Sequence, residues 1–153
     1  MFMRLLRNSI IVGLVFLLIG SASAQVLTDN NAGLPGLWAG STAWGDYDGD
    51  GDADILVVGL TGPANNCVPI ARVYRNDNGR FTDINAGLSG IYLGQAAWGD
   101  YDGDGDLDIA LSGLTSQGEN LSHIYRNDNG AFTRDFDQNL VLLRYSALAW
   151  GDP

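Results

Sequence analysis

The sequence is poor in several residue types on which enzymes and extracellular domains often rely. Among its 153 residues there are one cysteine and one histidine, and all eight basic residues are arginine, so lysine is absent. The single cysteine, Cys67, cannot form a disulfide within the chain, and we interpret it as an incidental loop residue. Outside the cell, a chain of this kind would need some device other than a disulfide to stabilise its fold.

The scarcity of histidine and glutamate also argues against an active site. His123 and Glu119 are the only residues of their types, and no nucleophile has a plausible base near it in the pattern. His123 falls in an expected strand, where a packed or half-exposed side chain is the simplest interpretation. The residues by themselves therefore predict no enzyme.

The charge of the chain is strongly negative and concentrated. The formal net charge is −10, and the string AWGDYDGDGD occurs twice, from Ala43 and from Ala97. Most of the aspartates lie in these two strings and the aspartate just after each, so the charge belongs to two loops. A nucleic acid or an anionic membrane would require a basic patch instead, and we expect neither as a partner.

The first 24 residues have the pattern of a secretory signal peptide. Arg4 and Arg7 precede an apolar run from Ile10 to Gly20, and a small-residue Ala-Ser-Ala sequence ends at Ala24. We predict cleavage near Ala24–Gln25 and a secreted or cell-surface protein. The alternative is an uncleaved membrane anchor, for which the apolar run is short; the mature chain should have no membrane span.

The remaining sequence is an internal repeat. The segment from Leu27 matches the segment from Phe81 at an offset of 54 residues without a gap, and each copy is followed by the motif YRNDNG. A third copy starts at Phe132 and reaches only AWGDP at the end of the chain. The predicted organisation is therefore a signal peptide (1–24) and a repeat region (25–153), with repeats at about 27–80, 81–131 and 132–153, the last truncated.

Within a repeat, the local signals are those of short β-strands. Strands are expected at residues 41–44 and 95–98, at 55–58, at 71–74 and 123–125, and after the turn signals Asn78-Gly79 and Asn129-Gly130. No segment beyond the signal peptide has a helical period. Four short strands in about fifty residues are typical of a propeller blade, so we predict an all-β fold of antiparallel four-stranded β-propeller blades, with two complete repeats and the start of a third.

The duplicated acidic loop is a candidate calcium site. Its aspartates recur at every second position, and two glycines, Gly49 and Gly51 in the first copy, allow the tight curl that would turn these side chains to one centre. Ca²⁺ takes six to eight oxygen ligands, whereas Mg²⁺ prefers few carboxylates. We expect about two Ca²⁺ ions, bound by the side chains of Asp46, Asp48, Asp50 and Asp54 with the carbonyl of Asp52, and of Asp100, Asp102, Asp104 and Asp108 with the carbonyl of Asp106.

The acidic loops differ from the calcium loop of an EF-hand. An EF-hand loop has a glutamate at position 12 and flanking helices. If Asp46 and Asp100 are counted as position 1 of their loops, position 12 is Val57 or Leu111, within an expected strand. The loop therefore joins two strands. The alternative is that the loops are acidic turns that only make the hairpins soluble, but clustered carboxylates repel one another unless a cation is present.

The strings GDYDGDGDLDIALSG and HIYRNDNGAFT resemble the FG-GAP repeat, also called the VCBS-type repeat, and the resemblance extends over residues 27–153. Such repeats form the propeller head of integrin α subunits and occur in many secreted bacterial proteins. The resemblance implies a seven-bladed propeller, calcium in the loop between the first two strands of a blade, and a role in adhesion or ligand binding. Partners would meet the opposite face, where Trp38 and Tyr92, in the expected loops 33–39 and 87–93, could be contacts or could pack between blades.

Two function hypotheses follow. The first is a secreted, calcium-binding module for adhesion or ligand binding, whose partner is an extracellular protein or carbohydrate. The second is an accessory or structural segment of a larger secreted enzyme, such as a polysaccharide-degrading hydrolase or lyase. A closed propeller needs at least four blades, so we expect the chain to be the N-terminal fragment of a longer protein, or else an oligomer that completes the ring.

Overall fold

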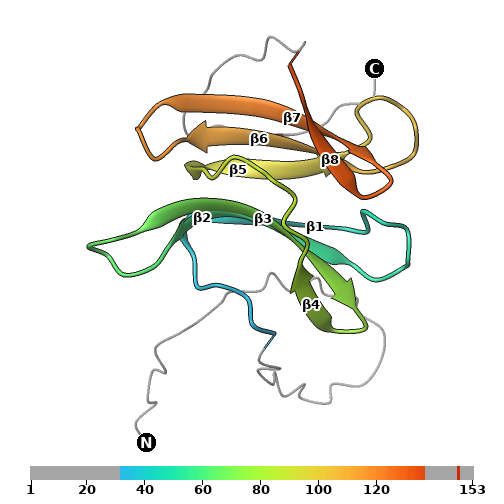
Figure 1. Ribbon diagram of the computed structural model, residues 1–153, viewed down its shortest axis with the longest axis horizontal. Helices are drawn as coiled ribbons and strands as arrows, with labels where there is room; N and C mark the ends of the chain where they lie inside the picture. The colour runs from blue at the N-terminus through green and yellow to red at the C-terminus, as the bar shows by residue number, and fades with distance from the viewer. Residues whose placement is uncertain (1–31, 137–147, 149–153) are drawn as a thin grey trace, which may run out of the picture.

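Two four-stranded antiparallel sheets make up the described fold. The computed structural model describes residues 32–136 and residue 148, and Figure 1 shows the sheets as two layers, one above the other. Within these residues there is no α-helix, so the all-β prediction is confirmed. The predicted signal peptide and most of the third repeat, including Trp150, lie outside the described residues.

Each sheet has its strands in chain order. The first has the order β1-β2-β3-β4 and the second β5-β6-β7-β8, all antiparallel neighbours. The bounds are β1 Trp38–Gly45, β2 Asp54–Thr61, β3 Val68–Asp77, β4 Arg80–Asp83, β5 Tyr92–Gly99, β6 Asp108–Leu114, β7 Asn120–Asp128 and β8 Ala131–Asp135. The repeat in sequence is therefore a repeat of sheets.

The strands are longer than the sequence signals predicted, but they lie where those signals placed them. The apolar run from Ile55 to Val58 is buried throughout and forms the centre of β2, as expected for a strand covered on both faces. Asn78 and Gly79 both have positive φ, 53° and 88°, and so do Asn129 and Gly130. These are the conformations of tight hairpin turns, which Asn-Gly favours.

The repeat boundary chosen from the sequence cuts through a strand. Phe81 begins the second sequence repeat, yet it lies in β4, the last strand of the first sheet, and pairs with Asn76. Phe132 lies in the same way in β8 and pairs with Asn127. Each sheet is thus completed by residues that the next sequence repeat contributes.

The two sheets pack through unlike faces. In the main core, Leu56 and Val58 of β2 lie with Ile109 and Leu111 of β6. The positions of β6 that correspond to Leu56 and Val58 are Ala110 and Ser112, which point away from the first sheet because side chains alternate along a strand. Stacking of one face on the opposite face of the next sheet is a head-to-tail contact that can continue from repeat to repeat, and it closes into a ring only where the rotation between sheets allows it.

The same hydrogen bond recurs at successive steps of the stack. The Ala96 N–H donates to Ser41 Oγ at 3.3 Å, joining β5 to β1. The Leu148 N–H donates to Gln95 Oε1 at 3.0 Å. Gln95 occupies in β5 the position that Ser41 occupies in β1, so Leu148 contacts the second sheet as Ala96 contacts the first.

The segment between β4 and β5 contributes to the core between the sheets. It crosses from one layer to the other (Figure 1), and Ile91 is fully buried while Ile84 and Leu88 pack against the main core. Its Ser89 bonds the Tyr125 hydroxyl, with oxygens 2.9 Å apart. On the other face of the first sheet, Leu34 and Leu37 from the corresponding segment cover a second cluster: Ile55, Val57, Ile70 and Tyr74.

The structure offers no helix, in the residues it describes, that could cross a membrane.

Candidate metal centres

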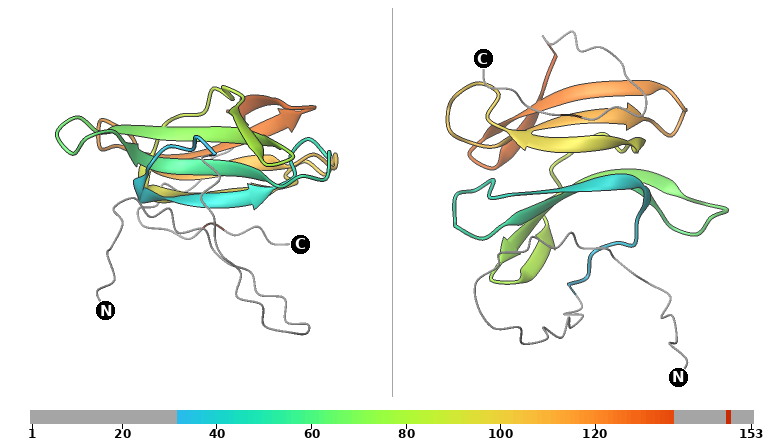
Figure 2. Two further views of the ribbon diagram at one scale, coloured as in Figure 1. Left: turned by 90° about the horizontal axis from the view of Figure 1, so that it is seen from below. Right: turned by 180° about the vertical axis from the view of Figure 1, so that it is seen from behind.

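The two acidic loops lie at the same end of the two sheets. The first connects β1 to β2 and the second connects β5 to β6, and both are found together in each of the views in Figures 1 and 2. The loops 62–67 and 115–119 lie at the opposite end. Both sheets have the same strand order, and they stack with their corresponding ends together (Figures 1 and 2).

Each acidic loop is curled, as predicted. Gly49 and Gly51 have φ of 72° and 93°, and Gly103 and Gly105 have φ of 77° and 96°. An added Cβ would meet nothing within 4 Å at these four glycines. Glycine is therefore required at these positions because residues with a side chain rarely adopt a positive φ, and not because neighbouring atoms leave no room for a side chain.

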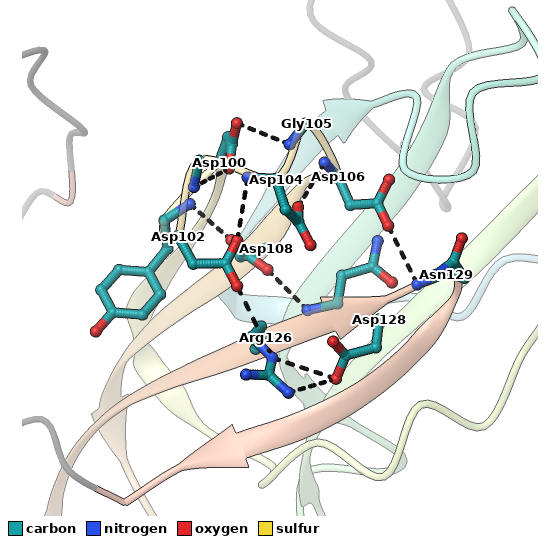
Figure 3. A network of polar contacts seen from close by, with 12 residues as sticks. Asp100, Asp102, Asp104, Gly105, Asp106, Asp108, Arg126, Asp128 and Asn129 are labelled. Atoms are coloured by element: carbon teal, nitrogen blue, oxygen red, sulfur yellow. Dashed lines mark hydrogen bonds and ion pairs between the residues drawn. The ribbon is translucent and has the colours of Figure 1, made fainter.

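The first aspartate of each loop accepts hydrogen bonds from the loop backbone. Asp46 accepts the N–H of Asp50 at 3.1 Å and of Gly51 at 3.0 Å through its two oxygens. Asp100 accepts in the same way from Gly103, at 2.8 Å, and from Gly105, at 3.1 Å. The loop is thereby wrapped around its own first carboxylate, as Figure 3 shows for the second copy.

Three carboxylates converge in each loop. Each group offers oxygens that all lie within 4.8 Å of one another, and the groups are Asp46, Asp48 and Asp50, and Asp100, Asp102 and Asp108. All six belong to the side-chain ligands predicted from the sequence. Asp54 and Asp104, also predicted as ligands, do not fall in these groups.

The last aspartate of each loop motif is buried and is the first residue of the strand that follows, β2 or β6. Asp54 and Asp108 are both 0% exposed. The oxygens of Asp54 accept the N–H of Tyr47 at 3.0 Å and of Asn76 at 2.8 Å, and Asp108 accepts from Tyr101 and Asn127. Burial raises the pKa of both carboxyls, and the backbone donors offset part of that rise.

The aspartate at position 7 fastens each loop to the neighbouring hairpin turn. Asp52 Oδ2 accepts the N–H of Asn78 at 2.7 Å, and Asp106 Oδ2 accepts the N–H of Asn129 at 3.1 Å. These side chains are engaged away from the carboxylate groups described above. That Asp52 and Asp106 contribute their backbone carbonyls to a cation stays a prediction.

The electrostatics of the loops favour a cation. The pKa of Asp48 is raised by desolvation and then by the negative charge of Asp50, which means that its surroundings disfavour the ionised form of Asp48. Arg126 is the nearest positive side chain to the second loop: its Nε lies 3.9 Å from Asp102 Oδ2, but its Nη2 bonds Asp128 at 2.8 Å (Figure 3).

The donor set fits calcium. Every group that converges is a carboxylate, and oxygen ligands of this kind are the ones that Ca²⁺ takes. Nitrogen and sulfur ligands, which Zn²⁺ would favour, are missing from both groups. The side chains of Asp46, Asp48 and Asp50 would hold the first ion, and those of Asp100, Asp102 and Asp108 the second.

Two residues that the sequence analysis did not single out connect the loops. Tyr47, inside the first acidic loop, is 6% exposed, and its ring stacks on Trp98 of the second sheet with centroids 6.0 Å apart. Asn127 is fully buried, and its Nδ2 donates to the carbonyls of Tyr47 and Leu107, both at 3.1 Å. The repetition of Tyr in the loop and of Asn in YRNDNG was the available signal.

The aromatic residues predicted as ligand contacts begin strands and do not lie in loops. Trp38 pairs with Leu60 at the start of β1, and Tyr92 pairs with Leu114 at the start of β5. Both are therefore at the end opposite the acidic loops. Trp38 is 49% exposed and Tyr92 is half-buried. Cys67, half-buried, is a free thiol in the loop before β3.

The fold and the loops define a class of protein: stacked four-stranded sheets, each with an aspartate-rich loop between its first two strands. Residues 58–111 match the family model of the FG-GAP-like repeat. The match runs from within β2 to within β6 and includes the whole second acidic loop, so this segment is similar to an FG-GAP-like repeat. No curated protein and no solved structure matches the chain.

Proposed function

We propose that this protein is a secreted calcium-binding repeat module that serves adhesion or ligand binding, with its sheets acting as blades of a β-propeller. The observation that carries the proposal is the duplicated carboxylate group at one end of the stack, present at Asp46, Asp48 and Asp50 and again in the second loop. The FG-GAP-like repeat supports both the propeller arrangement and the calcium.

Calcium would serve here in place of disulfides. A cation that binds the curled loop and not the unfolded chain stabilises the fold by mass action. It would also relieve the repulsion among the carboxylates, which otherwise opposes the curl. The loops would then act as structural sites that fix the ends of β1, β2, β5 and β6.

The binding surface would lie at the end of the sheets opposite the calcium loops. Trp38 supports this because a half-exposed indole offers a large apolar contact area to a protein or a carbohydrate partner. Tyr92 lies at the corresponding position of the second sheet. Partners of this kind would be extracellular, as the predicted signal peptide requires.

The proposed role is not catalytic. His123 is half-buried in β7, and its Nδ1 has no hydrogen-bond partner in the described part of the chain. The clustered carboxylates are engaged with backbone N–H groups and would hold calcium. An accessory role beside a catalytic segment elsewhere in a larger protein remains a compatible alternative.

The test is a calorimetric Ca²⁺ titration of the full chain, with circular dichroism before and after chelation. We expect saturation near two ions per chain and a lower unfolding temperature once calcium is removed. The variant D48N/D102N should lose most of the binding. The control D83N/D135N removes the same charge from the last residues of β4 and β8, outside both acidic loops, and should bind calcium as the wild type does. Equal loss in both variants, or no binding by the wild type, would contradict the proposal.

A further inference from the structure

We propose that the two acidic loops bind cations cooperatively, and that the side chain of Asn127 transmits the coupling between them. This rests on the proposed function, because it assumes that both loops take Ca²⁺. It goes further in assigning a communication path to one buried amide group that touches both loops directly.

The first loop reaches Asn127 through Tyr47. This residue stands between Asp46 and Asp48, which belong to the first carboxylate group. Its N–H donates to Asp54 Oδ2 at 3.0 Å, and its carbonyl accepts from Asn127 Nδ2 at 3.1 Å. Any rearrangement that brings the first carboxylates around a cation must therefore move or fix the peptide that Asn127 holds.

The second loop reaches Asn127 by two bonds. The Asn127 N–H donates to Asp108 Oδ1 at 2.7 Å, and Asp108 belongs to the second carboxylate group. Asn127 Nδ2 also donates to the carbonyl of Leu107 at 3.1 Å. Its Oδ1 accepts the Gly130 N–H at 2.7 Å, so the amide is fixed from both sides.

The chain of contacts from Asp54 through Tyr47 and Asn127 to Asp108 is continuous and largely buried. Asp54, Asn127 and Asp108 are all 0% exposed. Bonds in such surroundings hold their partners firmly since water cannot replace them. Ordering one loop around a cation fixes Asn127 in the position that the other loop uses, so the second cation meets a loop with less freedom to lose.

The ring of Tyr47 strengthens the connection. It is buried against Trp98 and Phe132 of the second sheet, with centroids 6.0 Å and 5.6 Å away. The first acidic loop is therefore anchored on the sheet that carries the second loop. This makes the direction of the coupling positive, because both cations favour the same docked arrangement.

Asn76 provides a matched control within the same chain. It occupies the equivalent position in the first repeat and makes equivalent local bonds. Its backbone N–H donates to Asp54 Oδ1 at 2.8 Å, and its Nδ2 donates to the Ala53 carbonyl at 2.9 Å. Its Oδ1 accepts the Gly79 N–H at 2.7 Å. These partners all belong to the first repeat. Asn76→Ala thus removes the two local side-chain bonds, keeps the backbone bond to Asp54, and removes no bond between the described loops.

The experiment measures Ca²⁺ isotherms of the full chain by calorimetry at about 0.15 M salt, where charges about 8 Å or more apart are largely screened. The variants D48N/D50N and D102N/D104N each leave one loop intact and give its affinity alone. The product of the two binding constants of the wild type should exceed the product of these single-loop constants by about 5-fold or more, the lower range of allosteric coupling. By linkage, disabling either loop should weaken the other by the same factor.

Asn127→Ala should reduce this excess to near unity, whereas Asn76→Ala should retain it. Any direct repulsion or attraction between the loops would persist in Asn127→Ala, so the part that disappears is the part carried by the side chain. If Asn127→Ala does not fold, the single-loop comparison in the wild-type chain still decides whether coupling exists. Binding at two sites without excess overturns the coupling, and an excess unchanged in Asn127→Ala overturns its assignment to the Asn127 side chain; either result leaves calcium binding standing. No binding by the wild type overturns both.

Discussion

Trp98 lies flat against Tyr47, with 6.0 Å between the ring centroids and 6° between the ring planes. The first residue belongs to β5 and the second to the acidic loop before β2, so this stack joins a strand of one repeat to the metal loop of the other. Trp98 Nε1 also donates to the Ala43 carbonyl at 3.3 Å. The equivalent Trp44 contacts Phe81 edge-on and is 47% exposed.

The two equivalent tryptophans should therefore differ in their contribution to stability. Replacing Trp98 with Ala removes a stacked ring between the sheets and should lower the free energy of unfolding by about 3 kcal/mol, at the lower end of values for buried Trp. Trp44→Ala serves as the matched control and should cost less than half as much. Urea denaturation of both variants provides the measurement, and an equal loss would contradict the assigned packing.

Gly45 should be intolerant of a side chain. A Cβ there would lie 2.8 Å from Cδ1 of Trp98 and 3.0 Å from Cδ1 of Leu107. Gly45→Ala should lower the free energy of unfolding by about 1–3 kcal/mol because the core between the sheets becomes overpacked. Gly36→Ala is the control, since nothing lies within 4 Å of its added Cβ; an equal effect at both sites would argue against the inter-sheet contact.

Asp52 and Asp46 should have separable roles although both lie in the first loop. Asp52→Ala removes the hydrogen bond to the Asn78 N–H and should lower the free energy of unfolding by about 1 kcal/mol. It keeps the backbone carbonyl, so the Ca²⁺ affinity of the loop should change much less than in Asp46→Ala. Calorimetric titration compares the two, and a complete loss of binding in Asp52→Ala would show that its carboxylate is a ligand.

His123 should make the stability of the fold depend on pH. Burial, and then the positive charge of Arg134, lower the pKa of His123 below its ordinary value of 6.5. The folded state thus prefers the neutral ring and binds fewer protons than the unfolded state. Its contribution to stability is complete above pH 6.5 and is lost as the pH falls from there through the lowered pKa.

The measurement is the free energy of unfolding of the metal-free chain between pH 5 and pH 8, for the wild type and for His123→Gln. The difference between the two should be constant at the upper end and should move in favour of the variant as the pH falls. A difference that does not vary with pH would show that the imidazole titrates as it does in water.

Much of the fold follows from local sequence. The Asn-Gly pairs place two hairpin turns because both residues must adopt positive φ there. The run from Ile55 to Val58 predicts a strand covered on both faces, since a strand half exposed to water would alternate in polarity. The sequence predicts strands that are shorter than those of the structure, because residues at the strand ends such as Trp38 and Val68 are exposed and do not contribute to the pattern of buried apolar residues.

The candidate site is predictable only in part. Spacing identifies the aspartates of both loops because a curled loop directs alternate side chains to one centre, and the glycine conformations agree. The spacing does not predict that the individual aspartates have different roles. Asp52 bonds a hairpin turn that is distant in sequence, and Asp54 is buried by strands that pair beyond the loop.

The sequence by itself determined the repeated unit: its strands, its turns and its acidic loops, since each depends on conformations and periodicities within about fifty residues. Only the tertiary structure decided how one repeat meets the next. The contacts of Tyr47 with Trp98 and with Asn127 join residues far apart along the chain. No local pattern encodes such contacts, because they exist only once unlike faces of two sheets have been brought together.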